Sequence, residues 1–281
     1  MLIYNNVSEI RAYLTRLKRE GKSVGLVPTM GALHDGHMTL IDKARQSDIV
    51  VVSLFVNPLQ FNKSEDLDKY PRQLESDIAM LEPKCDVLFA PSESDMYDTV
   101  PMVTLDFKEM GSVLEGAFRP GHFNGVGVVV SKLFNIIQPD SAYFGLKDLQ
   151  QYLIIKQMVK DLSVPIEIVG CPIAREKSGL AMSSRNLRLS ETGKKTAANL
   201  FAGLSMAKNL VEKNRPLSET KSEVLGFYKS VGGLEIEYLE FVDNKLIIQS
   251  SLENDNNIAV CVAGYVEGVR LIDNLYLRSE N

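Results

Sequence analysis

Short apolar runs alternate with helically spaced apolar residues in the first part of the chain. The runs predict strands at residues 24–28, 49–55, 87–89, 140–144 and 166–169, and the nearly continuous run 49–55 predicts a strand buried on both faces of a sheet. The segments between them predict helices at about residues 36–47, 72–82, 126–137 and 145–161. This β-α-β-α order predicts an α/β fold with a Rossmann-like, doubly wound parallel sheet.

One further helix is predicted near the N-terminus, with Ser8 as its N-cap. Ile10, Leu14 and Leu17 would share one face of this helix, and Gly21 would end it. Prolines and glycines interrupt residues 91–125 repeatedly, so we expect that segment to be irregular.

The pattern changes after the polar, glycine-containing stretch 175–190. Two long helices are predicted at about 190–213 and 217–230, followed by strands near 234–243, 257–266 and 268–277. Apolar and polar residues alternate in these strands, as in antiparallel strands with one face in water. We therefore expect a Rossmann-like domain at residues 1–175 and a smaller C-terminal α+β domain at residues 176–281.

Composition narrows the class of protein. The 281 residues carry a formal net charge of −5 and no basic cluster, which argues against general nucleic-acid binding. Cys85, Cys171 and Cys261 are widely spaced, and we expect buried thiols in a reducing compartment. No apolar run approaches the roughly 20 residues of a membrane helix, and the N-terminus does not resemble a signal peptide. We therefore expect a cytoplasmic protein.

Polar segments, all but one of them containing glycine, follow the ends of several predicted strands. They lie at residues 28–37, 57–60, 145–148 and 177–185. Ligands of open α/β sheets bind beyond the carboxyl ends of the strands, so these segments predict one shared site. The first segment also begins a helix, where unpaired N–H groups and the helix dipole favour an anion such as phosphate.

His34 and His37 are two of only three histidines in the chain. They fit zinc ligation, a purely structural turn, or contact with a phosphate, and the phosphate contact agrees best with the strand-to-helix position. Lys147 stands at a helix start, where the dipole disfavours a cation unless a phosphate is bound or the side chain is simply solvated.

Three other segments offer polar groups. The loop around Arg185 could cap a helix or cover a triphosphate. Gln60 and Gln151 could hold a small substrate with hydroxyl and carboxylate groups, or be surface amides. His122 could serve either loop structure or the wall of an active site.

These residues together resemble a known family. His34-Asp35-Gly36-His37 is similar to the His-x-Gly-His signature of the nucleotidyltransferase-like superfamily, and Met182-Ser183-Ser184-Arg185 to its second signature. More narrowly, the chain resembles the pantothenate synthetase (pantoate–β-alanine ligase) family, through motifs that occur in order at residues 28–37, 55–61, 119–123, 143–151, 179–186 and 270–274.

The resemblance implies AMP-forming ligation of pantoate and β-alanine through a pantoyl adenylate, with Mg²⁺ accompanying ATP. It implies a homodimer and a lid role for residues 176–281. The residues that it assigns to ATP are Met30, Gly31, Ala32, Leu33, His34, Asp35, Gly36, His37, Gly145, Leu146, Lys147, Asp148, Ala174, Met182, Ser183, Ser184 and Arg185.

Specific roles also follow from the resemblance. His37 would assist the departing pyrophosphate, with help from His34, Lys147 and Arg185, while Gln60 and Gln151 would hold pantoate. The family usually has a polar residue where this chain has Leu146, so only backbone contacts are expected there. The metal ligands are not assigned.

Two other functions compete with this interpretation. Another superfamily member would transfer a nucleotide to a phosphorylated acceptor and would need no amine. A nucleotide sensor without turnover would lack cationic or imidazole groups at the phosphates, whereas this chain has both kinds.

Overall fold

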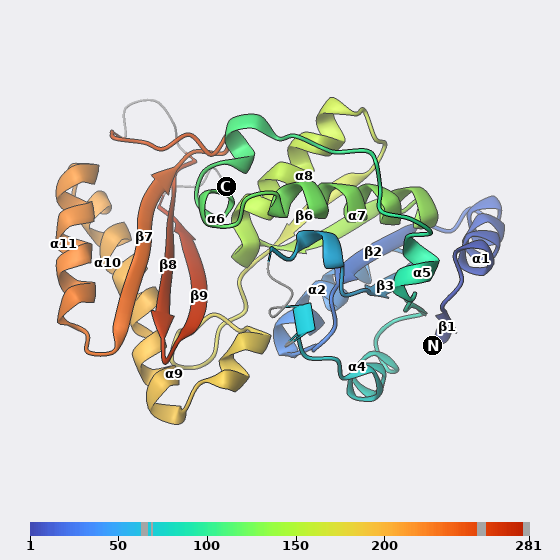
Figure 1. Ribbon diagram of the computed structural model, residues 1–281, viewed down its shortest axis with the longest axis horizontal. Helices are drawn as coiled ribbons and strands as arrows, with labels where there is room; N and C mark the ends of the chain where they lie inside the picture. The colour runs from blue at the N-terminus through green and yellow to red at the C-terminus, as the bar shows by residue number, and fades with distance from the viewer. Residues whose placement is uncertain (63–66, 69, 252–256, 278–281) are drawn as a thin grey trace. The chain divides into compact units, whose positions relative to one another are not determined.

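The computed structural model describes residues 1–62, 67–68, 70–251 and 257–277 (Figure 1). The chain divides into two compact units, which we describe separately. The first contains Met1–Leu146 and Ile154–Pro172, and the second contains Lys147–Leu153 and Ile173–Asn281.

A six-stranded sheet forms the centre of the first unit, in the order β1-β4-β3-β2-β5-β6. All its neighbouring strands are parallel. The strands are β1 (Leu2–Tyr4), β2 (Val24–Thr29), β3 (Ile49–Leu54), β4 (Val87–Phe89), β5 (Ser141–Gly145) and β6 (Glu167–Cys171). The order reverses between β2 and β5, and the carboxyl ends of such a pair are the usual binding place in this architecture.

Helices and short turns connect these strands. They are α1 (Val7–Arg19), α2 (Asp35–Ala44), η1 (Pro58–Gln60), α4 (Leu74–Leu81), α5 (Glu93–Met96), η2 (Lys108–Gly111), α6 (Glu115–Phe118) and α7 (His122–Ile137). Apolar residues of α2, β2, β3 and β4 pack into one buried cluster, with Ile41, Val52 and Leu88 fully buried. The continuous apolar run that predicted a doubly covered strand is therefore confirmed in β3, which is buried from Val50 to Leu54, whereas the edge strand β6 is mostly half-buried.

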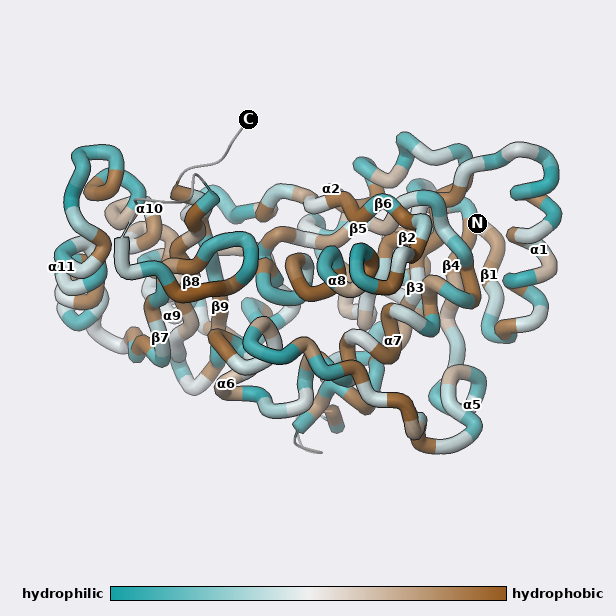
Figure 2. The backbone as a smooth tube through the Cα atoms, turned by 90° about the horizontal axis from the view of Figure 1, so that it is seen from above, coloured by the Kyte–Doolittle hydropathy of each residue, from teal (hydrophilic) through white to brown (hydrophobic). Residues whose placement is uncertain are grey.

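The second unit contains an antiparallel sheet in the order β7-β8-β9. Its strands are β7 (Leu234–Val242), β8 (Ala259–Val266) and β9 (Val269–Tyr276), and its helices are α9 (Glu191–Ala197), α10 (Asn199–Glu212) and α11 (Leu217–Ser230). β8 is one of the hydrophobic stretches in Figure 2 and is almost entirely buried. Gly203 of α10 makes room for the ring of Tyr228, since a Cβ there would lie 2.3 Å from it.

Further short turns, η3 (Leu146–Asp148) and η4 (Ser184–Arg188), precede α8 (Leu149–Asp161) and α9. The predicted fold class is confirmed by the parallel sheet and the smaller antiparallel sheet. In the part of the chain that is described, no helix is both long and apolar enough to cross a bilayer.

Several local predictions need correction. Asn6, not Ser8, caps α1: its side chain accepts from the amides of Ser8 and Glu9. The short strand β1 was not predicted, and α7 begins at His122 rather than at 126 because Gly121, with φ +80°, starts it earlier.

The helix predicted at 190–213 is in fact two helices, α9 and α10. The side chain of Asn199 donates to the carbonyls of Lys195 and Thr196, at 3.2 and 3.0 Å. Such an amide competes for the carbonyl groups that a continuous helix would use, which explains the break. Short helical turns also occur within the stretch 91–125 that was expected to be irregular.

Candidate active site

A strained turn follows β2 in the first unit. The hydroxyl of Thr29 donates to the Ser53 carbonyl at 2.9 Å and accepts from the amide of Gly31 at 3.3 Å. Gly31 has φ +82° and Ala32 has φ +52°, a left-handed conformation that disfavours a residue with a Cβ. Surrounding contacts must therefore hold this turn in place.

Asp77 of α4 supplies those contacts. Its carboxylate accepts from the backbone amides of Ala32 at 3.0 Å and Leu33 at 2.8 Å, and the residue is 2% exposed. Sequence reasoning missed Asp77, because an acidic residue in the first turn of a helix looks like an ordinary dipole partner. Only its buried position distinguishes it.

His34 and His37 share the N-terminus of α2. His34 is the N-cap and its Nδ1 accepts from the amide of Gly36 at 3.1 Å, while the His34 amide donates to Nδ1 of His37 at 3.3 Å. The ring centroids are 4.1 Å apart. Since each Nδ1 accepts, the neutral rings carry their protons on Nε2, which assigns both imidazoles as Nε2–H donors.

Gln60 lies close to the same turn. Its amide nitrogen contacts the sulfur of Met30 at 3.1 Å, and its amide oxygen accepts from Asn57 at 3.2 Å. Asn57 is 1% exposed, and its own oxygen accepts from the hydroxyl of Tyr97 at 3.0 Å. Two of the predicted site residues, Met30 and Gln60, are thus brought together, and Tyr97 is a supporting residue that the sequence did not indicate.

The backbone at Gln60 is fixed from α7. His122, 6% exposed, lies with its Nδ1 2.8 Å from the carbonyl of Gln60, and Arg119 donates to the same carbonyl at 3.4 Å. A Cβ on Gly125 would lie 2.3 Å from the carbonyl oxygen of Leu59. The glycine therefore allows η1 to lie directly on α7, and His122 serves the position of Gln60.

The end of β5 carries other predicted residues. Gly145 ends β5, and a Cβ there would meet no atom within 4 Å. Leu146 follows it and is half-buried. The open space beside Gly145 suits close approach of a ligand to the backbone.

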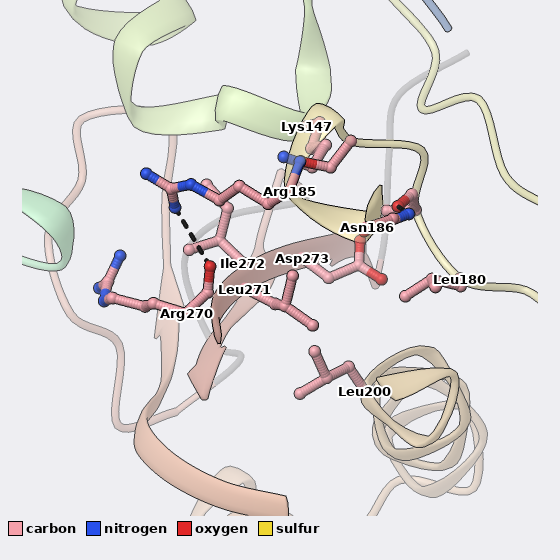
Figure 3. Close-up of a pocket in the computed structure, with 11 residues that line it drawn as sticks. Lys147, Leu180, Arg185, Asn186, Leu200, Arg270, Leu271, Ile272 and Asp273 are labelled. Atoms are coloured by element: carbon pink, nitrogen blue, oxygen red, sulfur yellow. Dashed lines mark hydrogen bonds between the residues drawn. The ribbon is translucent and has the colours of Figure 1, made fainter. Parts of the chain in front are cut away.

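A pocket in the second unit gathers cationic side chains (Figure 3). Lys147, Arg185 and Arg270 line it together with Ser183 and Asp273. The guanidinium of Arg185 donates to the backbone carbonyl of Arg270 at 3.2 Å (Figure 3). The backbone amide of Arg185 donates to the Ser183 hydroxyl at 3.2 Å. Two predicted cations and one predicted hydroxyl therefore face one space.

The charges in this pocket are not equally compensated. Arg270 forms an ion pair with Glu237 at 2.5 Å, whereas neither Lys147 nor Arg185 forms an ion pair with any carboxylate in the described ranges. Two cations without carboxylate partners on one pocket are the arrangement expected of an anion site.

Asp273 and Arg175 form a buried ion pair that the sequence did not reveal. The guanidinium contacts both carboxylate oxygens, at 2.6 and 2.9 Å, and its carbon lies 3.8 Å from the ring centroid of Phe201. Burial raises the pKa of Asp273, and the charge of Arg175 opposes that rise. The two residues are 98 positions apart in the chain, so only the fold brings them together.

The remaining predicted residues of the second unit lie in several local environments. The Ala174 carbonyl accepts from the amide of Met182 at 2.9 Å. Ser184 is the first residue of η4 and is half-buried, as is Gln151 in α8, while Asp148 is exposed. The roles assigned to all these residues stay predictions.

Neither the histidine pair nor the rest of the described chain gathers three potential metal ligands of the His, Cys, Asp or Glu type. All three cysteines are free and buried, as predicted. Burial raises the pKa of Cys85 to about 12 and that of Cys171 to about 11, so these thiols are not nucleophiles at neutral pH.

Known proteins match this chain over nearly its full length. A model of the pantoate-β-alanine ligase family matches residues 2–276. The chain belongs to the pantoate–β-alanine ligase family. The resemblance inferred from the motifs is confirmed.

Individual relatives of the ligase family cover nearly the whole chain. Pantothenate synthetase of Cytophaga hutchinsonii is 48% identical over 281 residues, covering 99% of each chain. The enzyme of Aquifex aeolicus is 43% identical over 282 residues, again with 99% of each chain covered.

Two solved ligase structures agree with the fold. Pantothenate synthetase of Thermus thermophilus superposes with a TM-score of 0.93 at 40% identity, covering 99% of this chain and 100% of that chain. The pantoate-β-alanine ligase of Francisella tularensis, solved in complex with "Beta-gamma ATP" and β-alanine, has a TM-score of 0.82 at 37% identity, covering 100% of this chain and 99% of that one.

Proposed function

We propose that this chain joins pantoate to β-alanine with the cleavage of ATP, releasing AMP and pyrophosphate. One observation carries the proposal best: both imidazoles at the N-terminus of α2 accept through Nδ1 and so direct Nε2–H as their donor. A helix N-terminus with two such donors suits a triphosphate whose negative charge grows as a bond breaks.

The first step forms an adenylate. A carboxylate oxygen of pantoate attacks the α-phosphorus of ATP, and the bond to the bridging oxygen of pyrophosphate breaks. His37 donates a hydrogen bond to the departing pyrophosphate, and His34 supports it. Lys147 and Arg185, which lack carboxylate partners among the described residues, supply positive charge to the same phosphates.

The second step forms the amide. The amine of β-alanine attacks the acyl carbon of the pantoyl adenylate, AMP leaves with the bonding electrons, and the new amide nitrogen loses a proton. Gln60 is fixed by Asn57 and by contacts to its carbonyl, so it can hold pantoate without losing much conformational freedom. We assign Gln151 to pantoate as well.

The two parts of the chain have different proposed roles. Residues 1–175 bind ATP and pantoate, with the turn Met30–His37 contacting ATP and Gly145–Leu146 contacting it through the backbone. Residues 176–281 act as a lid that brings Met182–Arg185 to the nucleotide, and the backbone at Ala174 contacts adenine. We also propose a cytoplasmic homodimer, which light scattering of the purified protein tests directly.

Mg²⁺ would accompany ATP in this reaction. Among the described residues, no three His, Cys, Asp or Glu side chains gather into a potential metal site, and we assign no protein ligand to the ion. Mg²⁺ commonly keeps its waters and binds substrate phosphates, and no step proposed here depends on a protein ligand to the ion.

Isotope exchange tests the proposal. Labelled pyrophosphate should enter ATP when pantoate is present and β-alanine is omitted, because adenylate formation is then reversible. With β-alanine added, AMP, pyrophosphate and pantothenate should appear in equal amounts. Pantoate that stimulates no exchange would refute the proposal, and a nucleotide left on the product would favour a nucleotidyltransferase.

A further inference from the structure

Asn274 of β9 makes a long-range contact with the turn that carries Lys147. Its side-chain amide donates to the backbone carbonyl of Lys147 at 2.9 Å, across 127 positions of the chain, and Asn274 is 4% exposed. The contact is made to the backbone of Lys147, so it fixes the position of the Cα atom from which that side chain extends.

The buried ion pair holds Asn274 in turn. Arg175 donates to the Asn274 carbonyl at 3.3 Å, and the Asn274 amide donates to the carboxylate of Asp273 at 2.8 Å. Backbone and side chain of Asn274 therefore have defined positions, because both are tied to groups that are themselves mostly buried.

The same ion pair reaches the loop before Arg185. Arg175 donates to the Gly179 carbonyl at 3.1 Å and forms a β-bridge with Ala181. Arg185 then donates to the Arg270 carbonyl of β9. Strand β9 therefore accepts a hydrogen bond from the side chain of Arg185 and donates one to the backbone of Lys147, so it holds both residues.

Stability alone does not account for this network. Burying a charged pair removes two ions from water, and apolar residues of similar size often stabilise a protein as well or better. A bidentate pair with additional backbone contacts does fix geometry, which an apolar cluster does less strictly.

We propose that Asn274 is a positioning residue for Lys147. The Arg175–Asp273 pair holds Asn274 and the loop before Arg185, so that Lys147 and Arg185 can both contact one triphosphate. This inference rests on the proposed function, since it assigns the two cations to ATP.

A double-mutant cycle between Asn274→Ala and Lys147→Ala tests the proposal, with pantoate-dependent ATP–pyrophosphate exchange as the readout. Asn274→Ala should lower kcat/KM for ATP by about tenfold, because small displacements of catalytic groups have large effects on rate. In the Lys147→Ala background the same change should have little further effect. An equal, additive loss in both backgrounds would overturn the proposal.

Asn199→Ala is the matched control. It also removes a half-buried amide that donates to backbone carbonyls of the second unit, but it does not line the pocket. It should change the urea midpoint without changing exchange. Asn274→Ser serves as a second variant, and failure of both Asn274 variants to fold would mark the residue as structural and overturn the proposal.

The wild-type protein separates the two hypotheses. If it shows no pantoate-dependent exchange, the proposed function fails. If it shows exchange and the cycle is additive, only the positioning role of Asn274 fails.

Discussion

The histidine turn of the first unit and the cationic pocket of the second offer an anion two different environments. The turn presents a helix N-terminus and two imidazoles, and its Ala32 and Leu33 amides are held by one buried carboxylate, Asp77. The pocket presents full charges from Lys147 and Arg185 on a frame held by a buried ion pair.

The difference concerns the free energy of desolvation. Burying a neutral donor costs less free energy than burying a charge, which needs either water or a partner. The turn can therefore be half-buried beside the parallel sheet, whereas Arg185 is exposed to solvent. The charges that are buried near Arg185 are those of Arg175 and Asp273, which neutralise each other. Variants that disturb one region and spare the other test this distinction.

The largest expected effect comes from the turn. His37→Ala removes a donor to the departing pyrophosphate, and we expect turnover to fall by about a hundredfold or more. Thr39→Val is the control, because it removes a hydroxyl that donates to the Gly36 carbonyl of the same helix. Unchanged exchange in His37→Ala would exclude His37 from catalysis.

The buried pair of the second unit should have the next effect. Arg175→Met leaves the Asp273 carboxylate buried without its counter-ion and should lower the free energy of unfolding by about 3–5 kcal/mol in urea titrations. Adding Asp273→Leu should restore most of the stability but not exchange activity. A double variant with wild-type exchange would show that the pair has no positioning role.

Asp77→Ala should affect the turn through its backbone. The amides of Ala32 and Leu33 lose their acceptor, so we expect about 1–3 kcal/mol less stability and weaker exchange. Asp42→Ala, which removes an exposed partner of Lys84, should change stability by less than about 1 kcal/mol. Equal effects of the two substitutions would contradict the role of Asp77.

Gly125→Ala tests the contact between α7 and η1. The added Cβ would overlap the Leu59 carbonyl, so we expect a loss of about 1–3 kcal/mol and a higher KM for pantoate through displacement of Gln60. Gly226→Ala lies in open space on α11 and should stabilise by about 0.4–1 kcal/mol. A KM equal to wild type would argue that Gln60 does not bind pantoate.

The smallest effect concerns the thiols. The folded-state pKa of Cys85 is about 12 against an ordinary value of 9.0, so its contribution to stability is complete below pH 9 and is lost as pH rises towards 12. Cys85→Ala should flatten that alkaline decline in urea midpoints. In the native protein at pH 8, an aromatic disulfide reagent should find no fast thiol; a fast reaction would contradict the burial.

Much of this architecture could be read from local patterns. The buried strands appear as apolar runs, and the His turn is recognisable because strand, glycines and helix adjoin each other. Even there the details depend on single side chains. Asn6 rather than Ser8 is the N-cap of α1, and the side chain of Asn199 accompanies a break in a helix that was predicted to be continuous.

The supports of the site could not be predicted because they are long-range. Asp77 is 45 positions from Ala32, and Asn274 is 127 from Lys147. In the sequence, neither Asp77 nor Asn274 differs from a polar surface residue, and only the fold shows that both are buried. Periodicity reports which face of an element is apolar, but it carries no information on which distant polar groups will meet.

The division of the chain has a consequence for dissecting the protein. Residues 147–153 belong with the second unit although β5 of the first unit ends only two residues earlier. A fragment that starts at residue 173 would lack Lys147 and would leave the carboxamide of Asn274 without that carbonyl acceptor. A chimera that exchanges the C-terminal half between relatives must therefore also exchange the segment Lys147–Leu153. Otherwise it combines Lys147 of one protein with Asn274 of another.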